Sequence, residues 1–277
     1  MLYQLAYRLV ASLPPAWLRA IGRWQWAGSL QRRFVRSGSE WLRHADVTIR
    51  HGVGSGLRFN AGGANPGYAL GTSEPLVQES LRQVLTEGAV FWDVGANVGF
   101  HTLIAARIVG PSGRVVAIEP LPANLAALRR NVALNQLANV TVIEGAASAK
   151  GGDVELQLGD EPTWARVAAA GPAHQAGSIR VRAFSLDDLQ AAEALPHPDV
   201  VKIDVEGAEC DVVAGMRGLI ARRAPVIVCE MHGKNAEFAE LLRPLGYELR
   251  VLEGDSSLEQ ARWDVHVIAT PVGRPVA

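Results

Sequence analysis

An acid and two glycines follow a short apolar run in the stretch FWDVGANVGF, residues 91–100. Gly95 permits a tight turn and close approach to the backbone, and a helix beginning near Asn97 would present unpaired N–H groups to a polar ligand. A carboxylate at Asp93 would repel a phosphate but suit a cationic aminoacyl group. The stretch therefore predicts a site for a nucleoside-type cofactor, although glycines at this spacing could also serve only strand-to-helix packing.

A second acid, Glu119, ends the next apolar run, VVAIEP, on the order of 20 residues after Gly95. An acid at that place can accept hydrogen bonds from ribose hydroxyls. The chain has no GxGxxG at this turn and no Gly-Lys-Ser/Thr, so neither a dinucleotide fingerprint nor a P-loop is present. S-adenosylmethionine carries an ammonium and a sulfonium but no phosphate, and the acid-first turn favours it over NAD.

Strands and helices alternate from residue 89 onward. Helices are predicted over 98–109, 122–136 and the segment after Ser185, which has Asp188 in a capping-box position. The predicted strands are 89–94, 114–118, 140–143, 154–158, 179–184, 200–205, 226–229 and a terminal hairpin of 247–251 with 263–269. This alternation predicts a doubly wound α/β fold, a parallel sheet with helices on both faces.

We expect three parts in the chain: a helical N-terminal extension over 1–45, a small lead-in over 46–88, and the main domain over 89–270. The lead-in contains two predicted strands, 47–50 and 57–60, and a helix over 75–86 with Ser73 as its cap. Residues 1–26 combine an apolar face with scattered arginines. They could pack on the domain, pack on a second subunit of a homo-oligomer, or touch a membrane surface.

The composition limits the classes of function. The chain has 277 residues, of which 48% are hydrophobic, enough for a sizeable core. Its formal net charge of −1 provides no field that would draw it to nucleic acid, so we expect no nucleic-acid partner. Cys210 and Cys229 form neither a CxxC nor a Cys/His metal spacing, and no apolar window is long enough to span a membrane. A cytoplasmic location is the expectation.

Three motifs together resemble FkbM-type methyltransferases, which use S-adenosylmethionine on a Rossmann-like sheet. They are DVGANVGFHT (93–102), GPSGRVVAIEPLPANLAALRRNVALN (110–135) and VKIDVEGAE (201–209), with YALGTSE (68–74) as a weaker leading motif. The resemblance covers about residues 68–250. It implies a seven-stranded sheet whose last strand is antiparallel, and O-methylation of a hydroxyl on a small molecule such as a natural product or sugar.

The resemblance also assigns cofactor contacts to the first three strand ends. Asp93, Gly95 and Asn97 would hold the methionine part, Glu119 the ribose, and the stretch 144–146 would lie beside the adenine. The cofactor-binding set expected from the turn and the resemblance is Asp93, Gly95, Ala96, Asn97, Gly99, Glu119, Pro120, Glu144 and Gly145.

Two further pairs would carry the chemistry. Asp204 and Glu206 end the fourth strand of the main sheet, where strand alternation places both carboxylates on one face. Glu230 and His232 follow the fifth strand with the same spacing, and His232 is a natural general base. These four residues are the expected catalytic set, although Asp204 and Glu206 could instead cap a helix. They could also bind a divalent metal, which we do not favour; the expected metal ligands are none.

Two other functions stay open at this stage. An NAD-dependent oxidoreductase would need only the glycine turn and Glu119. A non-catalytic binding protein could retain the fold and use its N-terminal helices as a partner surface. The expected partner of the enzyme is a hydroxylated small-molecule acceptor whose identity the sequence does not give.

Overall fold

The computed structural model describes residues 7, 12–14, 40–159, 165–167, 177–254 and 256–273. The expected helical extension over 1–45 falls almost entirely outside these ranges, so its contacts with membrane or subunit stay predictions. Within the described ranges, no helix has both the length and the apolar character needed to cross a membrane.

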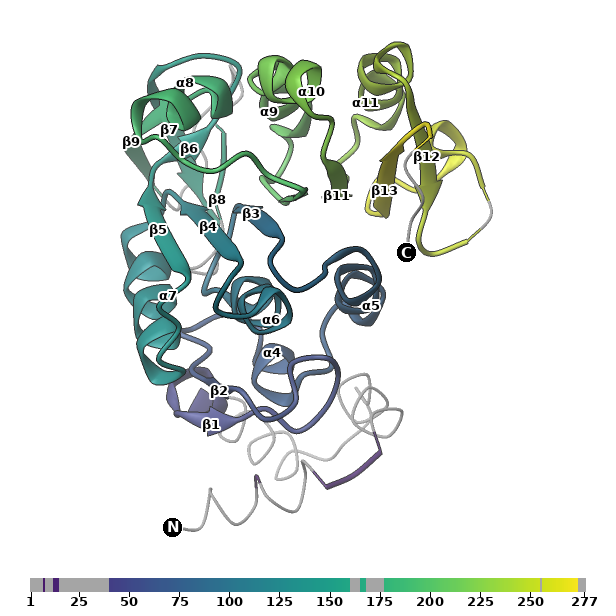
Figure 1. The fold of residues 1–277 in the computed structure, drawn as a ribbon. Helices are drawn as coiled ribbons and strands as arrows, with labels where there is room; N and C mark the ends of the chain where they lie inside the picture. Colours follow the sequence, from purple (N-terminus) through teal and green to yellow (C-terminus); the bar gives the residue numbers. More distant parts are fainter. Residues whose placement is uncertain are drawn as a thin grey trace.

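A seven-stranded sheet forms the centre of the molecule, in the order β12-β13-β11-β10-β3-β4-β5 (Figure 1). Its strands are β3 (Val90–Val94), β4 (Arg114–Glu119), β5 (Val140–Glu144), β10 (Val200–Ile203), β11 (Val226–Glu230), β12 (Tyr247–Val251) and β13 (His266–Pro271). β13 runs antiparallel to both of its neighbours, whereas β3, β4, β5, β10 and β11 are parallel. The predicted Rossmann-like sheet with an antiparallel last strand is confirmed.

Helices cover both faces of this sheet (Figure 1). One face carries α5 (Pro75–Val84), α6 (Phe100–Val109) and α7 (Pro122–Leu134). The other carries α8 (Leu186–Ala192), α9 (Glu209–Ala214), α10 (Arg217–Arg222) and α11 (Asn235–Leu242). Two short 3-10 turns, η1 (Arg243–Leu245) and η2 (Leu258–Gln260), connect elements near the C-terminus.

The apolar runs of the central strands explain this layering. In β10, Val200 packs toward α5 and α6, whereas Val201 packs toward α9 and α10. In β11, Val228 packs on the face of α5 and α6, and Ile227 packs on the face of α9 and α10. Strands buried on both faces are apolar at successive positions rather than at alternate ones, and the polar residues Lys202 of β10 and Glu230 of β11 lie near the carboxyl ends of their strands.

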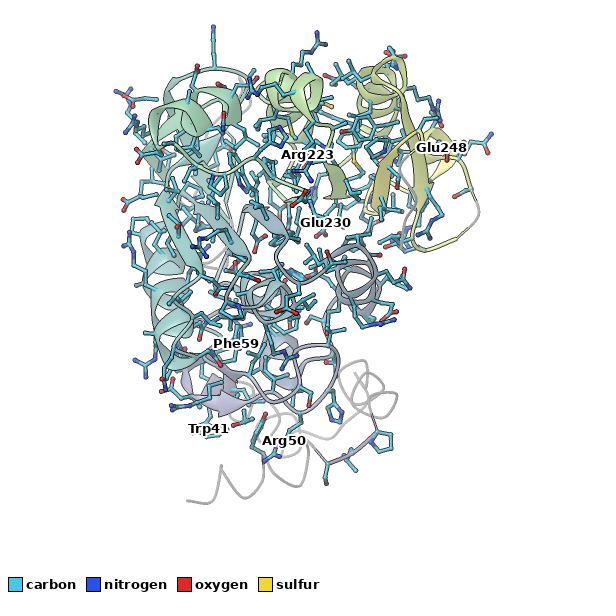
Figure 2. The ribbon with its side chains drawn as sticks, viewed as in Figure 1. Trp41, Arg50, Phe59, Arg223, Glu230 and Glu248 are labelled. Atoms are coloured by element: carbon cyan, nitrogen blue, oxygen red, sulfur yellow. The ribbon has the colours of Figure 1, made fainter. Side chains whose placement is uncertain are left out.

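The lead-in packs onto the main domain and shares its core. It contains β1 (Val47–Thr48), β2 (Arg58–Phe59), α4 (Pro66–Leu70) and α5. The Phe59 ring lies edge-on to Phe100 of α6, with centroids 5.7 Å apart, and is fully buried among these helices (Figure 2). Asn131 of α7 accepts from the N–H of Asn60 and donates to its carbonyl, at 2.7 and 2.8 Å.

The predicted strands 154–158 and 179–184 belong to a separate sheet. They pair directly with each other as β7 (Gly152–Leu158) and β9 (Ser178–Phe184), antiparallel, in the order β6-β9-β7-β8 with β6 (Ala146–Ala147) and β8 (Ala165–Val167). Sequence pattern alone gave these strands no partner, because their residues alternate in polarity and only the chain path decides which edge they meet.

The two predicted helix caps have different outcomes. Ser185 caps α8 as expected: its hydroxyl accepts from the N–H of Asp188 at 3.0 Å and donates to the Asp188 carboxylate at 2.7 Å. Ser73 does not cap α5, so that prediction is wrong. The N-cap is Glu74, in a left-handed conformation at φ 45, and its side chain makes no capping bond. The Glu74 carboxylate instead accepts a hydrogen bond from the Tyr68 hydroxyl.

Replacing Ser185 with Ala should lower the free energy of unfolding by about 1 kcal/mol, because the first turn of α8 loses its cap. Ser73→Ala, the matched control at the start of α5, should change it by less than about 0.5 kcal/mol. Urea unfolding followed by circular dichroism measures both. An equal loss in the two variants would contradict the cap assignment.

Candidate active site

The sheet changes its winding direction between β3 and β10. From β3 the chain adds β4 and β5 on one side, then crosses to add β10 and β11 on the other. Ligands of open α/β sheets bind at such a switch point, beyond the carboxyl ends of the strands. A cavity of about 470 Å³ lies there, lined by residues following β3, β4, β5, β10 and β11 and by the lead-in.

Eight of the residues proposed from the sequence line this cavity: Gly95, Asn97, Glu119, Pro120, Gly145, Asp204, Glu206 and Glu230. Five do not line it: Asp93, Ala96, Gly99, Glu144 and His232. The two predicted groups, cofactor and catalytic, therefore share one cavity.

Glu119 is a buried carboxylate held by three N–H donors. One oxygen accepts from the backbone N–H of Leu121 at 2.9 Å and from the Asn124 amide at 3.1 Å, and the other accepts from the N–H of Asn97 at 2.8 Å. Burial raises the pKa of Glu119 to about 7, against the opposing effect of these hydrogen bonds. The contact with Asn97 fixes the glycine turn against the end of β4.

Gly95 has a packing reason that the sequence did not reveal. Its φ is 78, and a Cβ built there would come within 1.8 Å of the backbone oxygen of Asp204. The turn after β3 thus touches the turn after β10 through bare backbone. Gly99 is required for packing against Leu128 of α7, because a Cβ there would lie 2.4 Å from the Leu128 side chain.

Asp93 lies at the sheet end, with 1% of its surface exposed. It accepts from the Thr102 hydroxyl at 2.6 Å. Burial raises the pKa of Asp93, while the nearby Lys202 ammonium opposes that rise. We find this carboxylate inside the protein rather than on the cavity wall, where the cofactor prediction had placed it.

Glu144 also lies off the cavity wall. Its side chain is 62% exposed, and its carboxylate lies 3.5 Å from Arg129 of α7. Gly145 and Ala146, which follow it, line the cavity. The predicted stretch therefore contributes backbone and a methyl group, not the acid.

Asp204 and Glu206 do not continue β10, which ends at Ile203. They sit in the following turn, where Glu206 has a φ of 51. Lys202, 3% exposed, donates from Nζ to Asp204 at 3.1 Å. Burial alone would lower the pKa of Lys202, but Asp204 and Asp93 raise it well above its usual range. Lys202 is thus a buried cation that Asp204 and Asp93 balance.

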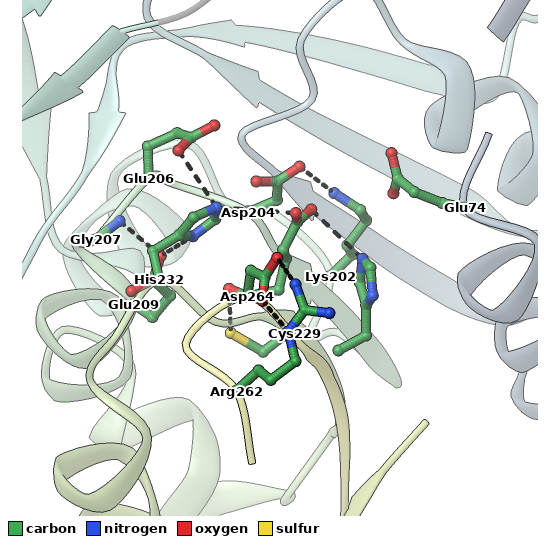
Figure 3. A network of polar contacts seen from close by, with 12 residues as sticks. Glu74, Lys202, Asp204, Glu206, Gly207, Glu209, Cys229, His232, Arg262 and Asp264 are labelled. Atoms are coloured by element: carbon green, nitrogen blue, oxygen red, sulfur yellow. Dashed lines mark hydrogen bonds and ion pairs between the residues drawn. The ribbon is translucent and has the colours of Figure 1, made fainter. Parts of the chain in front are cut away.

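His232 is tied to carboxylates on both ring nitrogens (Figure 3). Nδ1 lies 2.8 Å from Oε1 of Glu209, which is fully buried, and Nε2 lies 3.3 Å from Glu206 and 3.8 Å from Glu230. Burial opposes protonation, but the bond to Glu209 and the charge of Glu206 raise the pKa of His232 to about 9. An imidazole protonated at neutral pH has no free lone pair, which argues against the predicted role of general base.

The structure adds site residues that the sequence reasoning missed. Tyr68 and Glu74 of the lead-in line the cavity, and the Tyr68 hydroxyl donates to Glu74 at 2.6 Å. His266, at the start of β13, lies 3.5 Å from Glu230. Burial lowers the pKa of His101 in α6 well below 6.5, so this imidazole is neutral.

Some of these residues lie in motifs that could be recognised from the sequence. Lys202 and Glu209 lie inside VKIDVEGAE, and Tyr68 and Glu74 begin and end YALGTSE. An acid or a lysine inside a motif indicates that the residue has a role in the site. It does not indicate which other residue it contacts. His266 had no signal, because nothing in the predicted strand WDVHVIA (263–269) points to β11.

Comparison with known proteins identifies the family. Residues 93–250 match the model of the "Methyltransferase FkbM domain". The hexuronic acid methyltransferase AglP of Haloferax volcanii is 31% identical over 160 residues, which cover 56% of this chain and 62% of AglP. The 31-O-demethyl-FK506 methyltransferase FkbM of Streptomyces tacrolimicus is 29% identical over 216 residues, covering 67% of this chain and 81% of that protein.

Among solved structures, a methyltransferase FkbM from Methylobacillus flagellatus is 18% identical, with a TM-score of 0.47 over 67% of this chain and 44% of its own. The match to AglP spans less than two thirds of that relative's length. The family model, in contrast, spans more than half of this chain and contains both turns that line the cavity. The chain therefore belongs to the FkbM methyltransferase domain family.

Proposed function

We propose that the chain transfers a methyl group from S-adenosylmethionine to a hydroxyl oxygen of a small, uncharged molecule. One observation carries this proposal: carboxylates face one cavity from both sides of β3. Glu119 ends β4, whereas Asp204 and Glu206 follow β10 and Glu230 ends β11. Glu119 suits the binding of a nucleoside, and the other three carboxylates suit the removal of a proton.

The residues that line the cavity beside β4 fit the cofactor. Glu119 presents a buried acceptor at the cavity wall, and ribose hydroxyls are donors that would stabilise its ionised form. Asn97, Pro120 and Gly145 line the same wall. When bound, S-adenosylmethionine would supply an electrophilic methyl group on a sulfonium.

The carboxylates after β10 and β11 suit the acceptor. A hydroxyl oxygen that gains a methyl group must lose its proton, and a carboxylate within hydrogen-bond reach can take it. We assign that role first to Asp204, with Glu206 and Glu230 beside it. His232, in contrast, would hold Glu206 and Glu230 in place as a cation.

The acidic cavity wall favours an acceptor without negative charge. Glu74, Glu119, Asp204, Glu206 and Glu230 all line the cavity, and no Lys or Arg is among its lining residues in the described part of the chain. An anionic acceptor would meet like charge there. AglP is by name a hexuronic acid methyltransferase, which supports a sugar-like polyol, but the wall favours a neutral one.

The two alternatives are less well supported. Membership of a methyltransferase family favours methyl transfer over NAD-dependent oxidation. A purely binding role would leave the convergence of Asp204, Glu206 and Glu230 at one cavity without a purpose.

Glu119→Gln should weaken S-adenosylmethionine binding by at least about tenfold, because an acceptor for the ribose is replaced by a group that is partly a donor. Glu144→Gln is the matched control: it makes the same change at the end of the neighbouring strand, outside the cavity wall. Isothermal titration calorimetry measures both. Equal affinities in the two variants would remove Glu119 from the site.

The affinity of the wild-type protein should rise by up to about tenfold between pH 6 and pH 8. The Glu119 carboxyl, with its pKa of about 7, is largely protonated at the lower pH and ionised at the higher. The same titration in Glu119→Gln should show no such rise. A rise of equal size in that variant would assign the pH dependence to another group.

Asp204→Asn should lower the methyl-transfer rate by at least about 100-fold while leaving cofactor affinity within a few-fold, because it removes the proton acceptor and not the ribose contact. Asp211→Asn, on the exposed side of α9, is the control. Transfer of a labelled methyl group to a panel of neutral polyols gives the rate, and thermal unfolding verifies the fold. Full activity in Asp204→Asn would refute the assignment.

A further inference from the structure

A cluster of potential metal ligands lies beside Asp204 and Glu206 and includes Glu230. It joins Glu74 at the start of α5, Glu230 at the end of β11 and His266 at the start of β13. One carboxylate oxygen or ring nitrogen from each of the three lies within 4.8 Å of the other two. The three residues come from distant parts of the chain, so the fold alone brings them together.

Several buried atoms of this cluster lack a hydrogen-bond partner. They are Oε2 of Glu74, Nε2 of His266 and Nε2 of the neighbouring His101. His101 is 95% buried, since 5% of its surface is exposed, and its Nε2 points to Oε2 of Glu74 at 3.5 Å. Neither of these two atoms makes a hydrogen bond in this arrangement. Leaving buried polar atoms unpaired costs free energy, so their convergence suggests a missing ligand.

Other residues orient the unpaired atoms toward one another. Tyr68 donates to Oε1 of Glu74 at 2.6 Å, which leaves Oε2 facing the cluster. Glu253 binds Nδ1 of His266 at 2.5 Å, and Nε2 then lies 3.5 Å from Oε2 of Glu230. A carboxylate on one imidazole nitrogen is the usual support for a histidine whose other nitrogen binds a metal.

We propose that Glu74, Glu230 and His266 bind a divalent transition-metal ion, with His101 close enough to join or support the set. Two carboxylates and one or two imidazoles are a mixed oxygen and nitrogen set, which suits Mn²⁺, Fe²⁺ or Zn²⁺ better than Mg²⁺ or Ca²⁺. The charge also fits, because Glu74, Glu230 and Glu253 place three carboxylates around the cluster. This site shares no ligand with the group of Asp204, Glu206 and His232.

The position of this metal site indicates how a bound ion could take part in acceptor binding. Glu74 and Glu230 both line the cavity, so the ion would lie at its wall beside Asp204. An oxygen of a bound acceptor could then complete the coordination, a consequence that rests on the proposed function. The binding of the ion itself does not depend on methyl transfer.

The test uses the chelator-treated full chain with Mn²⁺ alone, without cofactor or acceptor. Loss of the electron paramagnetic resonance signal of free Mn²⁺ should report one bound ion per chain. Glu74→Gln and His266→Gln should each weaken binding by more than about 100-fold, and Glu253→Gln by about 10- to 100-fold through loss of histidine orientation. Added Zn²⁺ should displace Mn²⁺, whereas Mg²⁺ at the same concentration should not.

Glu206→Gln is the matched control, because it removes a carboxylate from the neighbouring cluster only. Its affinity for Mn²⁺ should stay within a few-fold of wild type. Wild-type protein should also melt at a higher temperature with Mn²⁺ than without it, and Glu74→Gln should lose this shift. No binding, or binding abolished by Glu206→Gln but kept in Glu74→Gln, would overturn the proposal. Neither result would bear on cofactor binding, which is measured separately.

Discussion

A buried ammonium group connects the two halves of the candidate active site. Lys202 sits on β10, inside the sheet end, and its charge is balanced by Asp204 in the following turn and by Asp93 on the neighbouring strand β3. Removing a lysine from water is costly unless carboxylates surround it. The same carboxylates would be costly to bury without the lysine, so Lys202, Asp204 and Asp93 stabilise one another.

The backbone reinforces this connection. The turn after β3 and the turn after β10 approach so closely at Gly95 and Asp204 that no side chain fits between them. The N–H of Asn97 in the first turn is bound by Glu119 from β4. Three neighbouring strand ends are thereby held in fixed relation, which is the condition for placing a cofactor and an acceptor at a defined distance.

The remaining chemistry of the cavity follows from an excess of acid. His232 and His266 are each held by a carboxylate on Nδ1, and the carboxylates around His232 raise its pKa to about 9. The Glu230 carboxylate lies 3.8 Å from Nε2 of His232 and 3.5 Å from Nε2 of His266. Such a wall attracts cations and disfavours anionic acceptors. The excess of carboxylates on the cavity wall therefore favours both the proposed metal ion and the proposed neutral acceptor.

The sequence by itself determined the alternation of strands and helices and the turns that carry the candidate site. The apolar runs, the glycine turn and the acid after β4 required only local pattern, because each depends on residues near in the chain. Ser185 was likewise recognised from its own helix.

Tertiary structure alone decided which of those residues meet. It placed Asp93 inside the protein, turned Glu144 to solvent, and gave His232 a partner in Glu209. It also brought Glu74 and His266 to Glu230 from opposite ends of the chain. Partners so far apart in sequence leave no periodic signal, and the charge state of a histidine depends on those partners rather than on its neighbours along the chain.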